Sequence, residues 1–596
     1  MTLPFLRPEA GTPAAGRPFR YRGLYVESKW GPDLMTLDDW RHLIDEMAFL
    51  RMNSLGIGVY GCWVVQYEGK RTEFLMVPFP EHPRLQTPKT IRWYSPAAKA
   101  EQELTYLPRM FEEDFFGQIV AYGRERGVAV RPHFNGPGHS TLIPSAYPEI
   151  SAKDEHGQPT GFGYCLSSER TYELLFSLYD SLVARHLKPN GGTWWHMGLD
   201  EVDAYMGIDE RDPSRVVDPW CRCPACSARS KPQRLVDFAV RCIEHLVGQG
   251  IEQITLWNDA LAKLDAYPLF KAALDGKGLR QHVAVQWWRY SDPPLVVGER
   301  ELRSWVTPMA GYWSNLFHHE YGTNIAEMVA QGVQVGSEGL DAYCIYDPAY
   351  FQSYACLASL GLEPSLTLAA FKDEFTRWLF EGTGAGAGGG HGQDVPAAWS
   401  HADVLFDSSY GPLGSLLDAL LYYWWTYPAQ RHVRYPRDQV AQLAADPLRA
   451  SRVLAVVQTQ AGELRQACTQ AAPRAADERR RRLLEEYAAE AGKLVGIVSA
   501  FRSAAAGWSH YRRAEQGPTR AETVEALVRA QAAFQTARQA VIDVMAELER
   551  VKAPYLRPQT LRDLTPLYRW LAEQHDRVRS LREAVEAGGL DELPPL

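Results

Sequence analysis

The pattern of apolar and polar positions changes once along the chain, near residue 370. Between about residue 20 and residue 365, short apolar runs alternate with stretches whose apolar residues recur at helical spacing. The runs predicted to be strands are 22–26, 54–59, 128–133, 193–198, 253–257, 283–287, 306–312 and 339–345. Helices are predicted between them, for example over 37–50, 114–126, 169–187 and 235–248. Eight strand–helix units predict an α/β fold, a (β/α)8 or TIM barrel.

The chain beyond residue 370 has a different pattern. Strand-like runs disappear, and long amphipathic helices are predicted over 477–504, 519–552 and 561–586. The Gly-rich stretch 381–392 predicts a flexible surface loop. We therefore divide the chain into an N-terminal extension (1–20), a (β/α)8 barrel (21–368) and an α-helical C-terminal domain (369–596).

Composition narrows the class of protein. The net charge of −9 over 596 residues does not indicate the basic surface that a nucleic-acid-binding protein needs. No run of apolar residues is long enough to predict a membrane helix, and the first residues lack the apolar stretch of a signal peptide. Nine cysteines, an odd number, fit reduced thiols better than a disulfide framework. We therefore expect a cytoplasmic protein that binds neither nucleic acid nor membrane.

Two adjacent carboxylates end the fourth predicted strand. Asp200 and Glu201 follow His196 and Gly198, at the carboxyl end where barrels of this kind carry their chemistry. Neighbouring residues of a regular strand face opposite ways, so both carboxylates reach one pocket only if the strand ends near Gly198. A paired acid suits proton transfer. A solvated pair in a loop, or a pair that caps a helix, is the alternative interpretation.

Several motifs around this pair point to one family. The run His196-Met-Gly-Leu-Asp-Glu201 resembles the His-x-Gly-Gly-Asp-Glu signature of glycoside hydrolase family 20, the β-N-acetylhexosaminidases. Arg22-Gly23 in the first strand, Pro137-Gly138-His139 after the third and Trp257-Asn-Asp259 after the fifth match the family in order. The resemblance covers about residues 20–350. The chain resembles a bacterial subgroup that has a barrel and a C-terminal helical domain and is often dimeric. A homodimer is therefore one expected assembly.

The resemblance implies an exo-acting enzyme that hydrolyses terminal β-linked GlcNAc or GalNAc with retention. In such a mechanism the acetamido oxygen of the sugar attacks C1 and gives an oxazolinium intermediate. Glu201 would be the general acid and base, with a raised pKa. Asp200 would stay ionised and hold the acetamido N–H, and Tyr312 would donate to the acetamido oxygen. No cofactor is required by this chemistry.

Other residues are expected to contact the sugar. The resemblance and their strand-end positions give these substrate-binding candidates: Arg22, His139, His196, Trp257, Asp259, Trp287, Trp288, Tyr346 and Asp347. For each of them an ordinary packing contact, ion pair or backbone hydrogen bond is the alternative. Trp287 and Trp288 are adjacent, so at least one of them is expected to pack away from the pocket.

The sequence departs from the family at three places. Leu199 stands where the signature has its second Gly. The second strand lacks the usual His and Asp, which leaves Tyr60 as a possible substitute. The eighth strand ends in Tyr346-Asp347. These departures leave two rival functions open. One is a glycosidase on the same scaffold without an acetamido requirement. The other is a non-catalytic carbohydrate-binding protein.

A cysteine cluster follows the acid pair. Cys221-Arg-Cys223-Pro-Ala-Cys226 could bind a structural zinc ion if a fourth ligand came from elsewhere, such as Cys165, Cys242 or a histidine. Reduced thiols in a loop are the alternative. The resemblance assigns no catalytic role to a metal here.

Overall fold

The computed structural model describes most of the chain, and it divides the chain into two compact units. The first unit comprises residues 1–90, 105–313 and 321–375, and the second comprises 91–104, 314–320 and 376–596. The domain boundaries inferred from the sequence stay predictions. The residues described are 6, 19–61, 65–67, 70–73, 75–206, 215–290, 301–311, 321–383, 444–445, 447–589 and 592–594.

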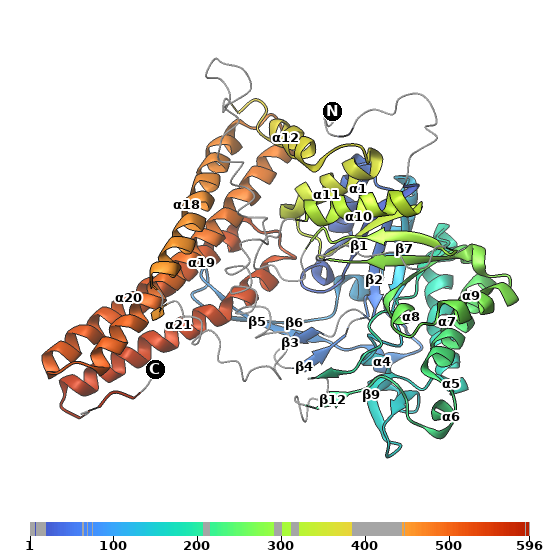
Figure 1. Ribbon diagram of the computed structural model, residues 1–596, viewed down its shortest axis with the longest axis horizontal. Helices are drawn as coiled ribbons and strands as arrows, with labels where there is room; N and C mark the ends of the chain where they lie inside the picture. The colour runs from blue at the N-terminus through green and yellow to red at the C-terminus, as the bar shows by residue number, and fades with distance from the viewer. Residues whose placement is uncertain are drawn as a thin grey trace. The chain divides into compact units, whose positions relative to one another are not determined.

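The first unit contains a closed barrel of eight parallel strands, which confirms the predicted fold class (Figure 1). Its strands are β1 (Tyr21–Val26), β2 (Ser54–Tyr60), β7 (Ala129–Phe134), β10 (Trp194–His196), β13 (Gln253–Trp257), β14 (Val283–Trp288), β15 (Arg303–Thr307) and β16 (Gly339–Cys344). Each strand pairs with its neighbours along the chain, and β1 pairs with β16 to close the ring. Parallel pairing brings all the carboxyl ends to one rim.

Two strands differ from their predicted bounds for local reasons. β15 begins three residues before its predicted start. It ends at Thr307, because Pro308 follows and has no N–H for the ladder. β10 ends at His196, and Gly198 then takes φ +72°. Because β10 ends before Gly198, Asp200 and Glu201 are not bound to the alternating orientation of strand residues.

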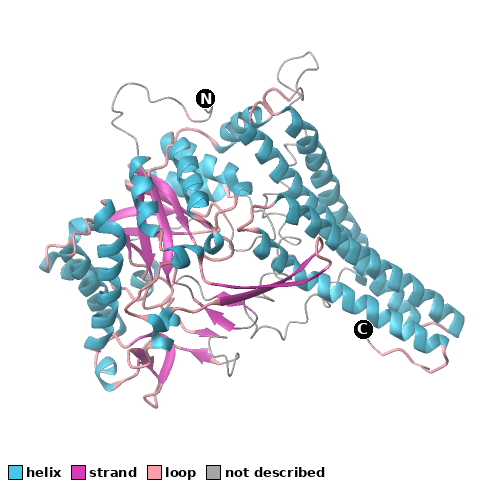
Figure 2. Ribbon diagram, turned by 180° about the vertical axis from the view of Figure 1, so that it is seen from behind, coloured by secondary structure: helices cyan, strands magenta, loops and turns pink. Residues whose placement is uncertain are grey.

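Helices cover the outside of the barrel, as the cyan ribbons around the magenta strands show in Figure 2. They include α1 (Leu37–Phe49), α3 (Phe116–Glu125), α5 (Glu169–Leu182), α7 (Lys231–Gly248), α9 (Tyr267–Gly276), α10 (Gly322–Val335) and α11 (Phe351–Leu362). Both α1 and α7 begin with a capping box, which fixes their first turn. Strand residues such as Leu55, Ile57, Ile254 and Val285 are fully buried.

Short hairpins leave the barrel between its strands. The hairpin of β8 (Ser151–Lys153) and β9 (Pro159–Tyr164) follows β7 and the short helix α4 (Leu142–Ala146). The hairpin of β5 (Lys89–Ser95) and β6 (Ala100–Tyr106) follows β2, and its residues 91–104 belong to the second unit. There Tyr94 stacks on Tyr568 with 4.0 Å between ring centroids. The sequence pattern did not predict either hairpin.

The second unit is a bundle of long helices, with α18 (Pro447–Ala471), α19 (Glu478–Glu515), α20 (Arg520–Val551) and α21 (Arg557–Glu586) packed in sequence (Figure 1). The C-terminal helical region is therefore confirmed. A charged group is buried between these helices: Lys552 Nζ lies 2.8 Å from Glu490 Oε1 and 3.1 Å from Glu486 Oε2. Among the described helices, none has the length and apolarity needed to cross a bilayer.

Candidate active site

The chain turns sharply at the acid pair. Gly198, Leu199 and Glu201 take φ values of +72°, +78° and +44°, in the left-handed region. A Cβ at Gly198 would also overlap Oδ1 of Asn135, so glycine is required there by both conformation and space. This turn breaks the alternation of the strand, and it allows the side chains of Asp200 and Glu201 to reach the same partner.

That shared partner is His139. Its Nε2 lies 3.2 Å from Asp200 Oδ2 and 3.2 Å from Glu201 Oε2, and the imidazole is buried. Burial opposes the imidazolium ion, but the charges and hydrogen bonds of the two carboxylates hold the pKa of His139 well above its usual value. The structure thus brings His139, Asp200 and Glu201 together.

Asn135 organises the turn, although the sequence analysis did not single it out. Its Nδ2 donates to Asp200 Oδ1 at 2.7 Å, and its Oδ1 accepts from the backbone N–H groups of Gly136 and Leu199. Burial raises the pKa of Asp200, but His139 and Asn135 outweigh burial and lower it overall. Asp200 is therefore ionised at neutral pH.

Asp259 supports Glu201 from the other side. It is the first residue of α8 (Asp259–Lys263), and its Oδ2 accepts from the Glu201 backbone N–H at 2.9 Å. Its Oδ1 accepts from Trp288 Nε1 at 3.1 Å. Burial, followed by the charge of Asp200, raises the pKa of Asp259 to about 6. Asp259 thus fixes the backbone of Glu201 and the ring of Trp288.

Aromatic rings form a neutral layer inside the barrel. The ring centroid of His196 lies 4.5 Å from those of both His133 and Trp257. The Tyr25 hydroxyl and His133 Nδ1 form a hydrogen bond of 2.7 Å. Burial lowers the pKa of His133 to about 4 and that of His196 well below its usual value. His196 Nδ1 accepts from the Gly198 backbone N–H at 3.0 Å. These histidines are therefore uncharged, unlike His139.

Further tyrosines and an acid stand near the carboxylates. Tyr343 of β16 donates to Glu27, which follows β1. The ring of Tyr290, beyond the end of β14, lies 5.4 Å from that of Tyr343 and 5.0 Å from that of Trp288. Burial, and then the charges of Asp200 and Glu27, raise the pKa of Tyr290 well above its usual value. Tyr290 is therefore a protonated hydroxyl close to the acid pair.

A second buried acid lies behind His139. Glu73 accepts from the backbone N–H groups of Thr141 and Leu142, and its charge interacts with His139. Burial raises the pKa of Glu73. Tyr60, the substitute proposed from the sequence, accepts from the Ile143 backbone N–H at 3.2 Å. Tyr60 thus bonds to the backbone of α4, and Glu73, from the segment after β2, is the residue whose charge acts on His139.

The structure does not bring all the predicted residues to the acid pair. Arg22 lies at the amino end of β1, and its guanidinium donates to the carbonyls of Phe19 and Arg51 at 2.8 and 3.0 Å. It lies beside Gly361 of α11, on the outside of the barrel wall. Trp287 stacks against Tyr267, whereas its neighbour Trp288 reaches Asp259. One of the two adjacent tryptophans therefore packs outside, as expected.

The residues predicted after the eighth strand have structural partners. Tyr346 is buried and donates to Glu46 of α1 at 2.6 Å, and its ring stacks on Tyr354. Asp347 Oδ1 accepts from the Ala349 backbone N–H at 2.9 Å and so caps a short 3-10 helix. Tyr312, the predicted donor to the acetamido oxygen, lies outside the described residues.

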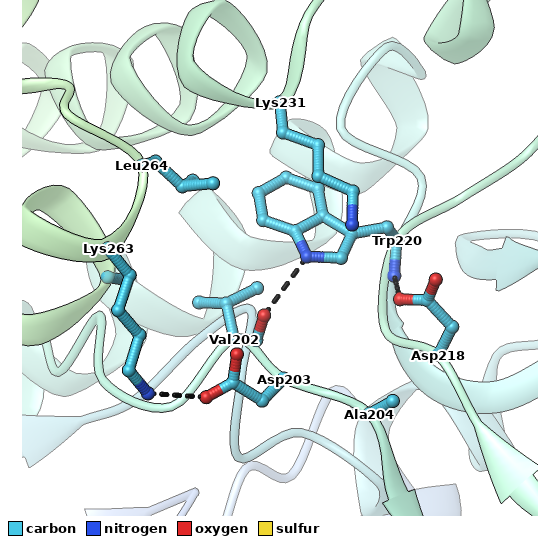
Figure 3. Close-up of a pocket in the computed structure, with 9 residues that line it drawn as sticks. Val202, Asp203, Ala204, Asp218, Trp220, Lys231, Lys263 and Leu264 are labelled. Atoms are coloured by element: carbon cyan, nitrogen blue, oxygen red, sulfur yellow. Dashed lines mark hydrogen bonds and ion pairs between the residues drawn. The ribbon is translucent and has the colours of Figure 1, made fainter.

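A small cleft of about 150 Å³ lies against the segment that follows Glu201 (Figure 3). Trp220 Nε1 donates to the Val202 carbonyl at 3.0 Å, and Lys263 Nζ lies 2.5 Å from Asp203 Oδ2. Lys231 and Asp218 complete the charged part of the lining. The lining is part charged and part apolar, and the cleft adjoins the acid pair without including it. Trp220 therefore connects the acid turn to the loop that carries the cysteine cluster.

Only one group among the described residues has the donor set for a metal ion. Cys165, Cys221, Cys223 and Cys226 place their sulfur atoms within 4.8 Å of one another. Cys242 is buried but does not belong to this group. The acid pair and His139 could act in proton transfer, whereas the cysteines lie apart from them and offer only sulfur.

Signals for the missed residues were weak in the sequence. Asn135 is directly after the third strand, where a polar residue is expected at a barrel rim, and Tyr290 follows the paired tryptophans of the sixth. Both could have been predicted from their positions just beyond the carboxyl end of a barrel strand. Glu73 belongs to a connecting segment with no strand-end position, so only the folded chain identifies it.

Comparison with known proteins agrees with the motifs. Residues 19–304 match the family described as glycosyl hydrolase family 20, catalytic domain. A β-hexosaminidase of Akkermansia muciniphila is 24% identical over 215 residues, which cover 35% of this chain and 37% of that protein. Beta-hexosaminidase 3 of Arabidopsis thaliana is 21% identical over 330 residues, covering 54% and 51%. The matches thus span about a third to a half of these relatives' own lengths.

A solved structure is similar over almost the whole chain. It is that of a GH138 enzyme targeting pectin rhamnogalacturonan II, with a TM-score of 0.50, 11% sequence identity and coverage of 95% of this chain and 84% of that one. At this identity the similarity concerns the fold alone. The similarity in fold therefore extends beyond the barrel into the helical region of this chain.

Proposed function

The barrel of this protein belongs to glycoside hydrolase family 20, and from this premise we propose that the chain is an exo-acting β-N-acetylhexosaminidase. It would remove terminal β-linked GlcNAc or GalNAc from an oligosaccharide or glycoconjugate, with retention and through an oxazolinium intermediate. The observation that carries the proposal is the contact of one buried imidazole, His139, with both Asp200 and Glu201.

The proposal gives the two carboxylates different roles. Asp200, whose pKa is lowered, accepts a hydrogen bond from the acetamido N–H and stabilises the positive charge that develops on the oxazolinium ring. Glu201 protonates the oxygen of the leaving group and then removes a proton from the attacking water. His139 and Asn135 hold Asp200, while Asp259 holds the backbone of Glu201.

Two aromatic residues support recognition of the sugar. Trp288 is fixed through its Nε1 by Asp259, and its indole face offers an apolar surface for the acetamido methyl group or the sugar ring. Tyr290 offers a hydroxyl near the acid pair. In this proposal Tyr290 and Tyr312 are the two candidate donors to the acetamido oxygen, and single Phe substitutions distinguish them.

Hydrolysis of p-nitrophenyl glycosides tests the proposal. We expect turnover of the N-acetyl-β-glucosaminide or N-acetyl-β-galactosaminide, and competitive inhibition by a thiazoline analogue of the oxazolinium ion. Glu201→Gln is expected to lower kcat by about 10²–10⁴-fold. A substrate with a better leaving group needs less protonation, so it should recover much of this loss in Glu201→Gln but not in Asp200→Asn. Glu155→Gln, a surface substitution near Arg222, is the matched control.

One observation favours a second candidate, a glycosidase on the same scaffold without an acetamido requirement. Arg22 and Asp347, both predicted to contact the sugar, hydrogen-bond to backbone groups instead. The sugar would then be recognised by other groups. Turnover of a plain β-glucoside or a rhamnogalacturonan II oligosaccharide, with no turnover of N-acetylhexosaminides, would support this candidate. Sugar binding without turnover of any of these substrates would instead indicate a carbohydrate-binding protein.

A further inference from the structure

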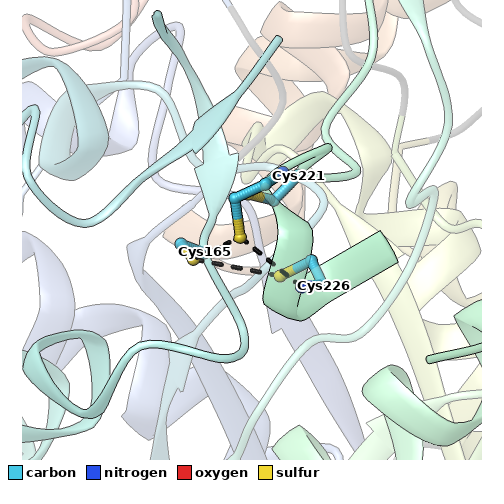
Figure 4. A group of neighbouring side chains, drawn as sticks. Cys165, Cys221 and Cys226 are labelled. Carbon is cyan, nitrogen blue, oxygen red and sulfur yellow. Dashed lines mark hydrogen bonds between the residues drawn. The ribbon is translucent and has the colours of Figure 1, made fainter. Parts of the chain in front are cut away.

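Four cysteines from two separate segments meet beside the acid loop. Cys165 directly follows β9, whereas Cys221, Cys223 and Cys226 come from the loop before α7, the last of them in the short helix α6 (Pro224–Ser227). All four are free thiols. Figure 4 shows the sulfur atoms of Cys165, Cys221 and Cys226 pointing toward one another. Three of the four cysteines are buried.

The spacing of the sulfur atoms fits a tetrahedral metal site. Cys165 Sγ lies 3.7 Å from Cys223 Sγ and 3.8 Å from Cys226 Sγ, and all four lie within 4.8 Å of one another. Four sulfurs bound to zinc at about 2.3 Å in a tetrahedron lie about 3.8 Å apart. A disulfide requires about 2.05 Å between its sulfurs, so these distances describe separate ligands.

Backbone amides are arranged to stabilise thiolates at this cluster. The N–H groups of Lys153 and Cys223 point to Cys221 Sγ at 3.4 and 3.5 Å, and the Cys226 N–H points to Cys223 Sγ at 3.4 Å. Cys226 Sγ lies 3.2 Å from Ser167 Oγ. Such outer partners orient the ligands of a metal site and support their negative charge.

We propose that Cys165, Cys221, Cys223 and Cys226 bind one structural zinc ion. Four neutral thiols would be only weak hydrogen-bond partners for one another in the small cluster that they form with Ala152. Loss of the thiol protons on binding gives four thiolates around a divalent ion, with a net charge that the buried Arg234 beside Cys221 partly offsets. The four ligands fill the coordination sphere, so the site is closed and has no catalytic position.

The zinc ion would fix the loop that follows the acid pair. Trp220 precedes Cys221, and its indole N–H donates to the Val202 carbonyl, one residue beyond Glu201 (Figure 3). Cys165 ties the same loop to the β8–β9 hairpin. The ion therefore joins two segments that the chain places more than fifty residues apart, and it positions Trp220 against the turn that carries Glu201.

Metal analysis of the full-length protein, purified under reducing conditions without an affinity metal, tests the proposal. We expect about one zinc per chain, in line with a site of four thiolate ligands. Replacement by Co²⁺ should give the strong thiolate-to-cobalt charge-transfer and tetrahedral d–d absorption bands. Stoichiometric iron would overturn the identity of the ion. The absence of bound metal, together with four titratable thiols and no cobalt bands, would overturn the site itself.

Single substitutions locate the ion. Cys165→Ser and Cys226→Ser should each lower zinc retention against a chelator at least tenfold, whereas Cys242→Ser, a buried cysteine outside the cluster, should retain it. Equal retention in all three variants would contradict the proposal. If a variant fails to fold, the cobalt spectrum of the unsubstituted protein still decides the question.

Hydrogen exchange measures the structural consequence without depending on catalysis. Removal of the ion from the intact protein should increase amide exchange at 151–165 and 220–227, with little change in the long helices 520–551 and 557–586. Unchanged exchange at the first two segments would show that the ion does not hold the loop. Because neither readout uses a substrate, the zinc site and the proposed glycosidase activity can fail independently.

Discussion

The imidazole of His139 and the carboxylate of Asp200 form a buried pair, with Nε2 3.2 Å from Oδ2. The same nitrogen lies 3.2 Å from Glu201 Oε2, so one positive charge serves two acids. Residues separated by sixty positions in the chain, on the loops after the third and fourth barrel strands, thus set the charge state of the site.

The substitution His139→Gln removes that positive charge. Burial then acts on Asp200 without its main opposing partner, so the pKa of Asp200 should rise. We expect the acidic limb of the kcat/KM profile to move to higher pH. On that limb, activity should fall about tenfold for each unit by which the pKa of Asp200 rises. An unchanged profile would show that His139 does not control Asp200.

Asp259 makes the stability of the folded protein depend on pH. Its pKa is about 6 in the folded protein against an ordinary value of 3.8, so the folded state holds the proton more tightly than the unfolded chain does. Its contribution to stability is therefore greatest at low pH, and it decreases as the pH rises from about 4 to about 6. The size of this change is about 3 kcal/mol, since each pKa unit corresponds to about 1.4 kcal/mol.

Urea unfolding at several pH values, compared with Asp259→Asn, measures this contribution. The variant should lose the decrease between pH 4 and 6. It should also lose activity, because an amide has a single acceptor oxygen for the two N–H groups of Glu201 and Trp288. Identical pH curves for the two proteins would contradict the assignment.

Gly198→Ala and Gly127→Ala separate backbone conformation from steric overlap. Both glycines have φ near +72°, but a Cβ at Gly127 meets nothing within 4 Å, whereas one at Gly198 overlaps Asn135. We expect Gly127→Ala to cost about 1 kcal/mol of unfolding free energy and Gly198→Ala clearly more, with loss of activity. Equal costs would show that Asn135 can move aside.

Asn135→Ala tests the turn from its other side. The substitution removes the donor to Asp200 and leaves the Gly136 and Leu199 amides without their acceptor. Unsatisfied buried amides cost about 1–3 kcal/mol each, so the thermal midpoint should fall and activity should fall with it. Asn135→Asp keeps that acceptor but sets a second carboxyl group against Asp200, and the repulsion raises the pKa of the pair. It should therefore also lower activity, with an acidic limb at higher pH. Full activity in either variant would argue against this role for Asn135.

Lys552→Met probes the helical unit. The substitution removes the ammonium group from Glu486, whereas Glu490 keeps its buried ion pair with Lys493. We expect a loss of about 3–5 kcal/mol in unfolding free energy at neutral pH. The loss should be smaller at acidic pH, where the carboxylates can take up protons. A loss that does not vary with pH would point to packing instead of charge.

Much of the architecture could be predicted from the chain because it depends on local pattern. Apolar runs of strand length separated by amphipathic stretches placed all eight strands, and helical spacing placed α19, α20 and α21. The end of β15 was misplaced because the apolar run continues beyond Pro308, which stops the ladder without interrupting hydrophobicity. The β5–β6 hairpin was missed because its exposed strands carry many charged residues.

By itself, the sequence determined the strand–helix alternation, the position of Asp200 and Glu201 at a strand end, and the requirement that the strand stop near Gly198. These features follow from local periodicity and from conformations that glycine adopts. Only the tertiary structure decided which side chains share a pocket. It joined His139 and Asn135 to the acid pair, placed Arg22 outside the barrel wall, and selected Cys165 as the fourth member of the cysteine cluster. Such contacts depend on how distant segments meet in space, which no local pattern encodes.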